Sequence, residues 1–500
     1  MTEPTTDPHH DEEHLLLEGG YGWRQRGGLI VGIVMLVATF FAPPLWGLSP
    51  EATRVALLAM TMALLWVTEA LPIPATALLP LVMLPALGIT EGKNAVREAA
   101  APYADPVIFL FMGGFMLSLA MERWNLHRRI ALAIIARVGT RPRALLLGFL
   151  VATAVISLWI SSNTATAMMM MPIGLSVHAM IREARGAAAA GFGAALVLAI
   201  AYGANIGGMG TLIGTPPNAI LKGYMEATHG VEVGFGRWLM LGLPLVAISL
   251  PLVHLILTRV SFRIDNTDMP GVREALMEER RGLGRMSWPE WVVGAGFTLA
   301  AGLWISRELW KAHLPMVTDE VIAMGVALLL FAIPADPKKG VFVLDWTCMK
   351  RMPWEVLILF GGGLSLASAI ESTQLASAMA SALESMGGWH PLLLVVLVCA
   401  IMVVATALTS NTATTLAFLP VIGSLATAVG QPALLLCVPV ALAASADFAL
   451  PVGTPPNAIA FGTGLVSLPR MVKAGIWVDL LFVILIPLLM WTVGRWVFGV

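Results

Sequence analysis

The segment SNTAT occupies residues 162–166 and recurs at 410–414, and the segment GTPPNAI occupies 214–220 and recurs at 453–459. The two copies are 248 residues apart for the first motif and 239 residues apart for the second. Both motifs lie within long apolar stretches. Two motifs in the same order, at nearly the same offset, indicate that the chain consists of two related halves.

A third similarity supports this duplication. FMGGFMLSLAMER begins at Phe111 and FGGGLSLASAIES begins at Phe360, an offset of 249 residues. Their glycines, Gly113–Gly114 and Gly361–Gly363, are expected to allow close contacts between helices. An odd number of spans per half would place the two copies antiparallel in a membrane, which is the inverted-repeat architecture of secondary transporters.

Composition places the chain in a lipid bilayer. Of its 500 residues, 58% are hydrophobic and only 12% are charged, and the mean hydropathy is +0.82. The net charge of -1 gives no indication of a nucleic-acid partner. We therefore predict an all-α polytopic membrane protein with about 11 transmembrane helices. The predicted spans are 28–48, 53–71, 74–90, 105–121, 187–225, 237–257, 288–306, 318–335, 355–370, 432–465 and 474–496.

The predicted organisation has four parts. Residues 1–27 form a disordered cytoplasmic tail, and residues 258–287 form a basic cytoplasmic linker between the halves. Residues 28–257 contain six spans, and residues 288–500 contain five spans in the inverted orientation. Arg24 and Arg26 precede the first span, so the positive-inside rule places the N-terminus in the cytoplasm and the C-terminus outside. This topology fits a multi-pass protein of the cell (inner) membrane.

The two SNTAT segments are predicted to lie at the tips of re-entrant helical hairpins. Between Arg143 and Arg182 there are 38 residues, nearly all apolar or small. One helix of that length would measure about 57 Å, far more than the bilayer core of about 30 Å. The arginines at both ends favour the same, inward side of the membrane. We therefore predict an inward-side hairpin at 144–181 and, in the second half, an outward-side hairpin at 391–430.

The two GTPPNAI segments are predicted to break membrane spans. Adjacent prolines lack N–H groups and cannot continue a helix. Thr215 can cap a new half-helix that begins at Pro216, and Thr454 and Pro455 can do the same in the second half. Each long span would then consist of two half-helices joined by an unwound link.

Such breaks suit the binding of a cation together with an anion. Hydroxyls, amide oxygens and freed backbone carbonyls can hold sodium, and half-helix N-termini attract anions through their N–H groups and dipole. Asn163 and Asn411 can direct the carbonyl toward a cation and the NH2 toward a carboxylate. No motif contains a basic side chain. A dianion would therefore depend on bound sodium for charge compensation, which gives a physical reason for coupling.

With these motifs and WVTEALPIPATALLP (66–80), the sequence resembles the divalent-anion/sodium symporter family over about residues 50–496. The resemblance implies a homodimeric, elevator-type carrier of dicarboxylates, without a cofactor other than the co-transported sodium ions. It implies sodium ligands at Ser161 or Ser162, Asn163, Gly214, Thr406, Thr409, Asn411 and Gly453. It also implies substrate contacts at Asn163, Thr164, Thr215, Ser410, Asn411, Thr412 and Thr454, with Pro216 and Pro455 shaping the links.

Two departures from the family pattern concern these sites. The family has a serine four residues before the first SNT, whereas this chain has Leu158 there and Ser157 one position earlier. Either Ser161 or Ser162 can then face the first cation. Asp447 has Gly208 at the matching place in the first half, and we interpret it as a proton site, a third cation site or a carboxylate bonded to its neighbours.

We expect sodium-coupled symport of C4-dicarboxylates such as succinate, malate and fumarate. A sodium-independent anion exchanger, or a sodium/sulfate or sodium/citrate symporter on the same scaffold, is the alternative. A passive channel would instead carry current without accumulating substrate. The sequence lacks an HExxH metal motif and a nucleophile with an adjacent base, so we do not expect an enzyme.

Overall fold

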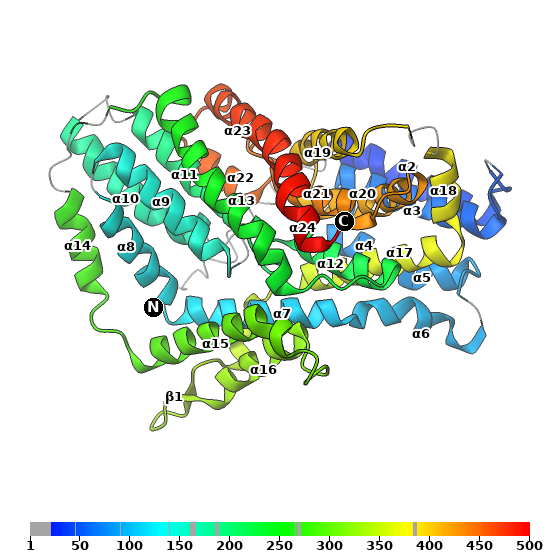
Figure 1. Cartoon of the computed structure of the whole chain (residues 1–500), viewed down its shortest axis with the longest axis horizontal. Coiled ribbons are helices and arrows are strands. Elements are labelled where there is room, and N and C mark those ends of the chain that lie inside the picture. Colours follow the sequence, from blue (N-terminus) through cyan, green and yellow to red (C-terminus); the bar gives the residue numbers. More distant parts are fainter. Residues whose placement is uncertain are drawn as a thin grey trace, which may run out of the picture.

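The computed structural model describes residues 22–500 apart from residues 46, 91, 140, 161–166, 186–189, 266, 268–271 and 384–387. The described part is almost entirely helical (Figure 1). The predicted tail, apart from residues 22–27, lies outside it. Residues 23–27 belong to helix α2, which runs from Trp23 to Phe41. The predicted all-α fold is confirmed for the part of the chain that is described.

The first half contributes α2 to α13. The helices are α2 (Trp23–Phe41), α3 (Pro50–Thr68), α4 (Ile73–Ala77), α5 (Leu79–Ala86), α6 (Ala95–Ala100), α7 (Pro106–Arg123), α8 (Leu126–Val138), α9 (Pro142–Ser157), α10 (Ala167–Arg185), α11 (Ala190–Met209), α12 (Pro216–His229) and α13 (Phe235–Leu255). Short 3-10 turns lie at η1 (Gly92–Asn94) and η2 (Ala101–Ala104), and a π-helical turn, η5 (Ile256–Ser261), extends α13.

The linker predicted at 258–287 contains α14, and the second half contributes α15 to α24 and one small antiparallel β-hairpin. The elements are α14 (Val272–Gly282), α15 (Trp288–Trp310), α16 (Asp319–Ala332), β1 (Pro334–Asp336), β2 (Val341–Phe342), η6 (Trp346–Arg351), α17 (Trp354–Ser372), α18 (Leu375–Leu383), α19 (Pro391–Leu408), α20 (Asn411–Ala428), α21 (Ala433–Ala444), α22 (Pro455–Gly462), α23 (Leu468–Leu489), η8 (Met490–Gly494) and α24 (Arg495–Phe498). Helices α15 and α16 lie along one edge of the molecule, beside α7 (Figure 1).

Eight helical segments of the described chain are long and apolar enough to cross a membrane. They are Trp23–Phe41, Pro50–Thr68, Pro106–Arg123, Gly191–Met209, Phe235–Ser261, Trp354–Ser372, Pro391–Leu408 and Leu468–Phe498. Most coincide with predicted spans. The predicted span at 74–90 is the short helix pair α4–α5, and that at 432–465 is the pair α21–α22, whose break was predicted from its prolines. The predicted spans at 288–306 and 318–335 correspond to α15 and α16, which are not among the eight segments. The multi-pass membrane character is therefore supported, and the number of spans stays a prediction.

Glycines allow close helix contacts at the predicted positions. A Cβ added at Gly113 in α7 would lie 2.7 Å from backbone atoms of Ala323 in α16. A Cβ added at Gly362 in α17 would lie 2.1 Å from the carbonyl oxygen of Ala77 in α4. Real Cβ contacts are not that short, so these helices can approach only because the glycines lack a side chain.

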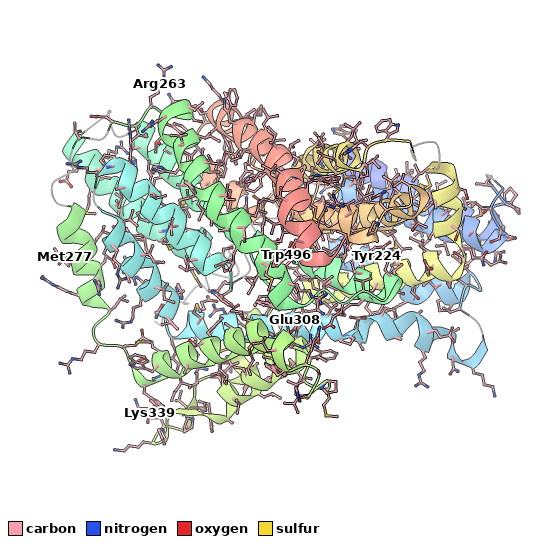
Figure 2. The ribbon with its side chains drawn as sticks, in the orientation of Figure 1. Tyr224, Arg263, Met277, Glu308, Lys339 and Trp496 are labelled. Carbon is pink, nitrogen blue, oxygen red and sulfur yellow. The ribbon has the colours of Figure 1, made fainter. Side chains whose placement is uncertain are left out.

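Ion pairs join the helix ends at the molecule's periphery. Arg129 in α8 binds Glu290 in α15 at 2.7 Å, and Arg123 at the end of α7 pairs with Asp345. A hydrogen bond from Thr347, together with Arg123, holds the pKa of Asp345 below its usual value. Charged side chains elsewhere, such as Lys339, project from the outer edge of the ribbon (Figure 2). The charged groups named here thus fasten the ends of the helices rather than their centres.

Candidate functional site

The two GTPPNAI segments break their helices as predicted. Helix α11 ends at Met209 and α12 begins at Pro216, while α21 ends at Ala444 and α22 begins at Pro455. Thr215 and Thr454 occupy the N-cap positions with extended backbone. The predicted half-helices separated by unwound links, at residues 210–215 and 445–454, are therefore present in both halves.

In each GTPPNAI motif, the asparagine side chain donates hydrogen bonds to backbone carbonyl oxygens in or next to its own link. The Nδ2 group of Asn218 lies 3.2 Å from the carbonyl oxygen of Gly208 and 2.8 Å from that of Thr211. The Nδ2 group of Asn457 lies 3.1 Å from the carbonyl oxygens of both Asp447 and Leu450. All three positions match across the halves at an offset of 239 residues. This role was not predicted, although the Pro-Pro-Asn sequence occurs in both motifs.

Side chains join the two links to each other. Asn205 in α11 donates from Nδ2 to the Oγ1 of Thr454 at 3.0 Å. The hydroxyls of Thr215 and Ser445 lie 3.3 Å apart. All four side chains are buried. The links of the two halves therefore meet in one buried polar cluster, which brings together the predicted substrate residues Thr215 and Thr454.

The second SNTAT segment lies at a break between helices and reaches the second link. Helix α19 ends at Leu408 and α20 begins at Asn411, with Ser410 at the N-cap. The hydroxyl of Thr406 lies 2.6 Å from Oδ1 of Asn411 and 2.8 Å from the carbonyl oxygen of Ala444. One hydroxyl proton cannot satisfy two acceptors fully. This group of three oxygens with one proton is the kind of environment that suits a sodium ion.

The other predicted residues of this segment lie nearby. Thr409 is bonded to Ala405 and Thr414, so its hydroxyl is engaged away from the Thr406 oxygens. Ser410 does not cap α20 with its side chain. The first N–H groups of a helix have no acceptor within it, so those of Asn411 and Thr412 can meet a carboxylate.

The half-helix N-termini at the links offer fewer N–H groups than we expected. The first two residues of α12 and of α22 are prolines, which have no N–H. The next N–H is already used: Asn218 donates to the carbonyl oxygen of Thr215, and Asn457 donates to Oγ1 of Thr454. Thr215 itself makes no side-chain cap. These N-termini can attract an anion through their dipole and the threonine hydroxyls, and the N–H groups must come from α20.

The first SNTAT segment lies outside the described residues, and with it the predicted Ser161, Ser162, Asn163 and Thr164. The end of α9 just before it is described. The hydroxyl of Ser157 donates to the carbonyl oxygen of Ala204 at 2.6 Å, and the hydroxyl of Thr211 donates to that of Leu158 at 2.6 Å. The end of α9, which precedes the first SNTAT in the sequence, therefore contacts α11 and the first link, as Thr406 in α19 contacts the end of α21.

Ser157 repeats the role of Thr406. Each hydroxyl binds a carbonyl near the C-terminal end of the first half-helix, Ala204 in α11 and Ala444 in α21. Ser157 and Thr406 are 249 residues apart, one more than the two SNTAT segments. Ala204 and Ala444 are 240 residues apart, one more than the two GTPPNAI segments. Ser157 stands four residues before Ser161, as Thr406 stands four before Ser410. Sequence reasoning noticed Ser157 but did not include it among the site residues.

The motif glycines are required by close contacts. A Cβ added at Gly214 would lie 2.5 Å from the carbonyl oxygen of Gly208 and 3.0 Å from that of Ser157. A Cβ added at Gly453 would lie 1.2 Å from Oδ2 of Asp447. Both glycines are buried. Oxygen atoms thus approach each link backbone where the sequence predicted cation ligands.

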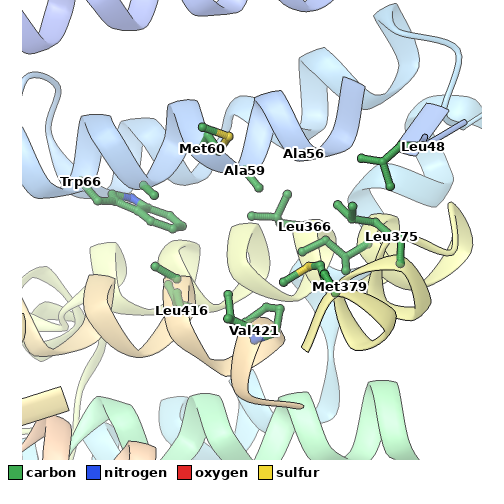
Figure 3. Close-up of a pocket in the computed structure, with 16 residues that line it drawn as sticks. Leu48, Ala56, Ala59, Met60, Trp66, Leu366, Leu375, Met379, Leu416 and Val421 are labelled. Atoms are coloured by element: carbon green, nitrogen blue, oxygen red, sulfur yellow. The ribbon is translucent and has the colours of Figure 1, made fainter. Parts of the chain in front are cut away.

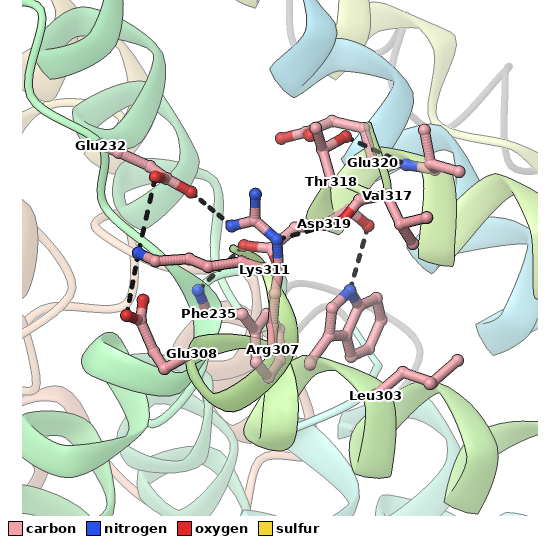
Figure 4. Close-up of polar contacts among 12 residues, drawn as sticks. Glu232, Phe235, Leu303, Arg307, Glu308, Lys311, Val317, Thr318, Asp319 and Glu320 are labelled. Atoms are coloured by element: carbon pink, nitrogen blue, oxygen red, sulfur yellow. Dashed lines mark hydrogen bonds and ion pairs between the residues drawn. The ribbon is translucent and has the colours of Figure 1, made fainter. Parts of the chain in front are cut away.

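A cluster of ion pairs beside α12 was not predicted; its buried members are Lys222, Arg307, Asp319 and Glu320. Lys222 in α12 pairs with Glu226 and, at 3.2 Å, with Glu320 in α16. Arg307 in α15 lies between Glu232 and Asp319, and Lys311 joins Glu232 to Glu308 (Figure 4). The cluster connects α12 to α16 through Lys222 and Glu320. Lys222 and Glu320, like Glu232 and Arg307, are far apart in the sequence, so no local pattern indicates these pairs.

An apolar cavity of about 460 Å³ lies between α3, α17, α18 and α20 (Figure 3). Trp66, Leu366, Met379 and Leu416 are among its lining residues. None of the predicted site residues lines it. Its apolar walls do not suit an anionic cargo.

The whole described chain matches known membrane proteins. Residues 25–500 match the family profile described as the sodium:sulfate symporter transmembrane region. A protein of Staphylococcus saprophyticus named sodium-dependent dicarboxylate transporter SdcS is 42% identical, over 96% of this chain and 93% of its own length. The protein of the same name in Staphylococcus aureus is 42% identical over 95% of this chain and 92% of its own length.

A solved structure shares the fold. The YdaH transporter of Alcanivorax borkumensis superimposes with a TM-score of 0.55 at 13% identity, over 90% of this chain and 98% of its own. At this identity the likeness concerns the fold alone.

Proposed function

The chain belongs to the sodium:sulfate symporter family, and from that premise we propose that it is a secondary active transporter that carries C4-dicarboxylates together with sodium ions. Succinate, malate and fumarate are the proposed substrates. The name shared by the two staphylococcal relatives supports both the dicarboxylate and the sodium. The family is one of transporters, which agrees with the expectation that the chain is not an enzyme.

One observation carries the sodium coupling. Thr406 Oγ1 lies within hydrogen-bonding distance of both Asn411 Oδ1 and the carbonyl oxygen of Ala444. Sodium prefers several uncharged oxygen ligands, and the ends of broken helices supply them. A sodium ion at this place would satisfy all three oxygens together and would draw in the backbone at Gly453.

The first half offers a second sodium place by the same construction. Ser157 binds the carbonyl oxygen of Ala204, and the carbonyl oxygens of Ser157 and Gly208 lie against Gly214. Ser161 or Ser162, together with Asn163, would complete this site. Ser157 corresponds to Thr406, and each stands four residues before a serine, Ser161 or Ser410. We therefore propose that Ser161, rather than Ser162, corresponds to Ser410.

The substrate would bind between the two halves. The N–H groups at the start of α20 and the hydroxyls of Thr215, Thr412 and Thr454 provide hydrogen-bond donors for its carboxylates. Asn163 and Thr164 would add the equivalent groups from the first half. The links contain no Lys or Arg in the sequence, so the positive charge that balances a dianion comes from sodium and from helix dipoles. Substrate affinity is therefore low until sodium binds.

We further propose that the two halves are inverted repeats in a homodimer that works as an elevator. The hairpin 144–181 would enter from the cytoplasmic side and the hairpin 391–430 from the outside, which leaves the N-terminus inside the cell and the C-terminus outside. The arginines that flank the first hairpin, and the absence of Lys and Arg from Glu371 to Leu468, support these orientations. Moving a loaded site that is nearly neutral lowers the cost of crossing the bilayer.

Uptake into proteoliposomes tests this function. With an inward sodium gradient, labelled succinate should accumulate above its outside concentration, and unlabelled malate and fumarate should compete with it. Replacing sodium by choline should remove the accumulation. Undiminished uptake in choline would contradict coupling and favour an anion exchanger. Competition by sulfate or citrate alone would indicate that one of these anions is the substrate. Steady current without accumulation would indicate a channel.

A further inference from the structure

Asp447 is a buried carboxyl group that the proposed sites do not use. It lies in the second link, between α21 and α22, and its side chain is 0% exposed. Neither carboxylate oxygen has a hydrogen-bond partner among the described residues. The backbone N–H groups of Ala449 and Leu450 act on it favourably, but they do not reach hydrogen-bonding geometry. A carboxylate that is buried within a membrane span without a partner is costly and points to a ligand.

A second carboxylate lies beside it. Asp479 in α23 accepts a hydrogen bond from the N–H of Phe448 at 2.9 Å and interacts electrostatically with Asp447. The hydroxyl of Tyr202 in α11, also fully buried, donates to the carbonyl oxygen of Phe448 at 2.9 Å. Within the described part of the chain, neither carboxylate forms an ion pair with Lys, Arg or His. Two like charges this close, without a cation, repel each other in a low-dielectric environment.

The comparison of the two halves shows that this carboxyl group is specific to the second link. Gly208 occupies the matching place in the first half, and its backbone oxygen lies against Gly214. In the second half the carboxylate oxygen Oδ2 of Asp447 lies against Gly453 instead. The same position beside the motif glycine therefore holds a backbone carbonyl oxygen in one half and a carboxyl oxygen in the other.

We propose that Asp447 and Asp479 bind an additional sodium ion beneath the second link, beyond the ions held at the two SNT motifs. This proposal rests on the proposed sodium-coupled transport. Neither carboxylate oxygen of Asp447 would lose a hydrogen bond on binding a cation, and Oδ1 of Asp479 accepts one from the backbone N–H of Phe448. Divalent calcium usually takes more acidic ligands, and the described residues contain no group of three or more acidic, His or Cys side chains arranged to hold a metal ion. A monovalent cation therefore fits best.

The N–H of Phe448 donates to Asp479. Burial disfavours the ionised form of a carboxyl group unless a cation compensates its charge. An ionised carboxylate pair coordinates a cation through its oxygens, and the cation relieves their mutual repulsion.

The test is the number of sodium ions moved with each dicarboxylate. In proteoliposomes with fixed gradients, the membrane potential at which net succinate flux vanishes gives this ratio. The wild-type protein should move more than two sodium ions per succinate. Asp447→Asn should still accumulate succinate with sodium, but with one sodium ion fewer. Asp447→Gly, which introduces the residue of the first half, should give the same lower ratio.

Matched variants separate the possible outcomes. Glu371→Gln, a carboxylate at the end of α17 and outside the links, should keep the wild-type ratio. An unchanged ratio in both Asp447 variants would overturn the proposal, and so would a change in proton movement with the sodium ratio unaltered. If neither variant folds, a wild-type ratio of two or less overturns it. Failure of the proposed function would appear differently, as wild-type protein that does not accumulate succinate at all.

Discussion

Asn411→Ala should reduce the initial rate of sodium-driven succinate uptake by about 100-fold or more and abolish accumulation. The substitution removes Oδ1 from the group of oxygens shared with Thr406 and Ala444, and it removes the NH2 group that can meet a carboxylate. Loss of a buried hydrogen-bonding group costs about 1–3 kcal/mol, and each 1.4 kcal/mol is tenfold in binding. Because the side chain would serve both sodium and substrate, both losses apply to transport.

The same reasoning applies to Asn163→Ala in the first half. The matched control is Asn94→Ala, which removes an exposed asparagine outside the motifs and should transport normally. Uptake should be measured on variants that are monodisperse in detergent and present at equal amounts in the liposomes. Normal accumulation by both Asn163→Ala and Asn411→Ala would show that the cargo binds elsewhere.

Lys222→Met should lower the free energy of unfolding by about 3–5 kcal/mol, because removing one partner of a buried ion pair leaves the other charge uncompensated. Lys222 is only 3% exposed and lies between Glu226 and Glu320. Methionine has a similar length and keeps the packing of the stem. The remaining carboxylates would then repel each other in a largely buried place.

Thermal unfolding of the purified protein in detergent measures this effect. Lys339→Met is the control, since Lys339 is 79% exposed and pairs only with Asp336. Its effect should stay near the 0–1 kcal/mol of surface ion pairs. The double variant Lys222→Met with Glu320→Gln should be more stable than Lys222→Met alone, because it removes one of the unpaired charges. Equal stability of Lys222→Met and wild type would contradict a buried ionic link between α12 and α16.

Much of this arrangement can be predicted from the sequence, because its causes are local. Two prolines in succession break a helix wherever they occur, so the half-helices at Pro216 and Pro455 follow from the motif itself. The helix break at Ser410 follows from the length of its apolar stretch. The duplication showed that each break occurs twice, and the matched hydrogen bonds of Asn218 and Asn457 agree with it.

Contacts between distant segments could not be predicted in this way. The hydrogen bond from Asn205 to Thr454 joins residues 249 positions apart. The pairing of Lys222 with Glu320 depends on how α12 packs on α16. The sequence did not indicate a role for Asp479, because a single acidic residue in a span does not reveal which residue it contacts. Such contacts are decided by tertiary packing rather than by the local pattern.

Some local predictions needed correction for physical reasons. Thr215 stands at the N-cap position, but its hydroxyl lies beside Ser445 rather than capping α12. Thr454 does cap α22. The difference shows that a polar partner from the other half can compete with the helix terminus for the same hydroxyl.

The central claim is that the two SNT segments meet around one binding site, and cross-linking between positions 163 and 411 tests it most directly. The protein would carry Asn163→Cys, Asn411→Cys and Cys348→Ser, since the native Cys399 and Cys437 are buried. A short bifunctional thiol reagent should join the two introduced cysteines within one protomer, as detected by mass spectrometry of the digested protein, and each single-cysteine variant should give no such product. Absence of the cross-link, with both cysteines modified freely from the lipid-facing side, would contradict the account.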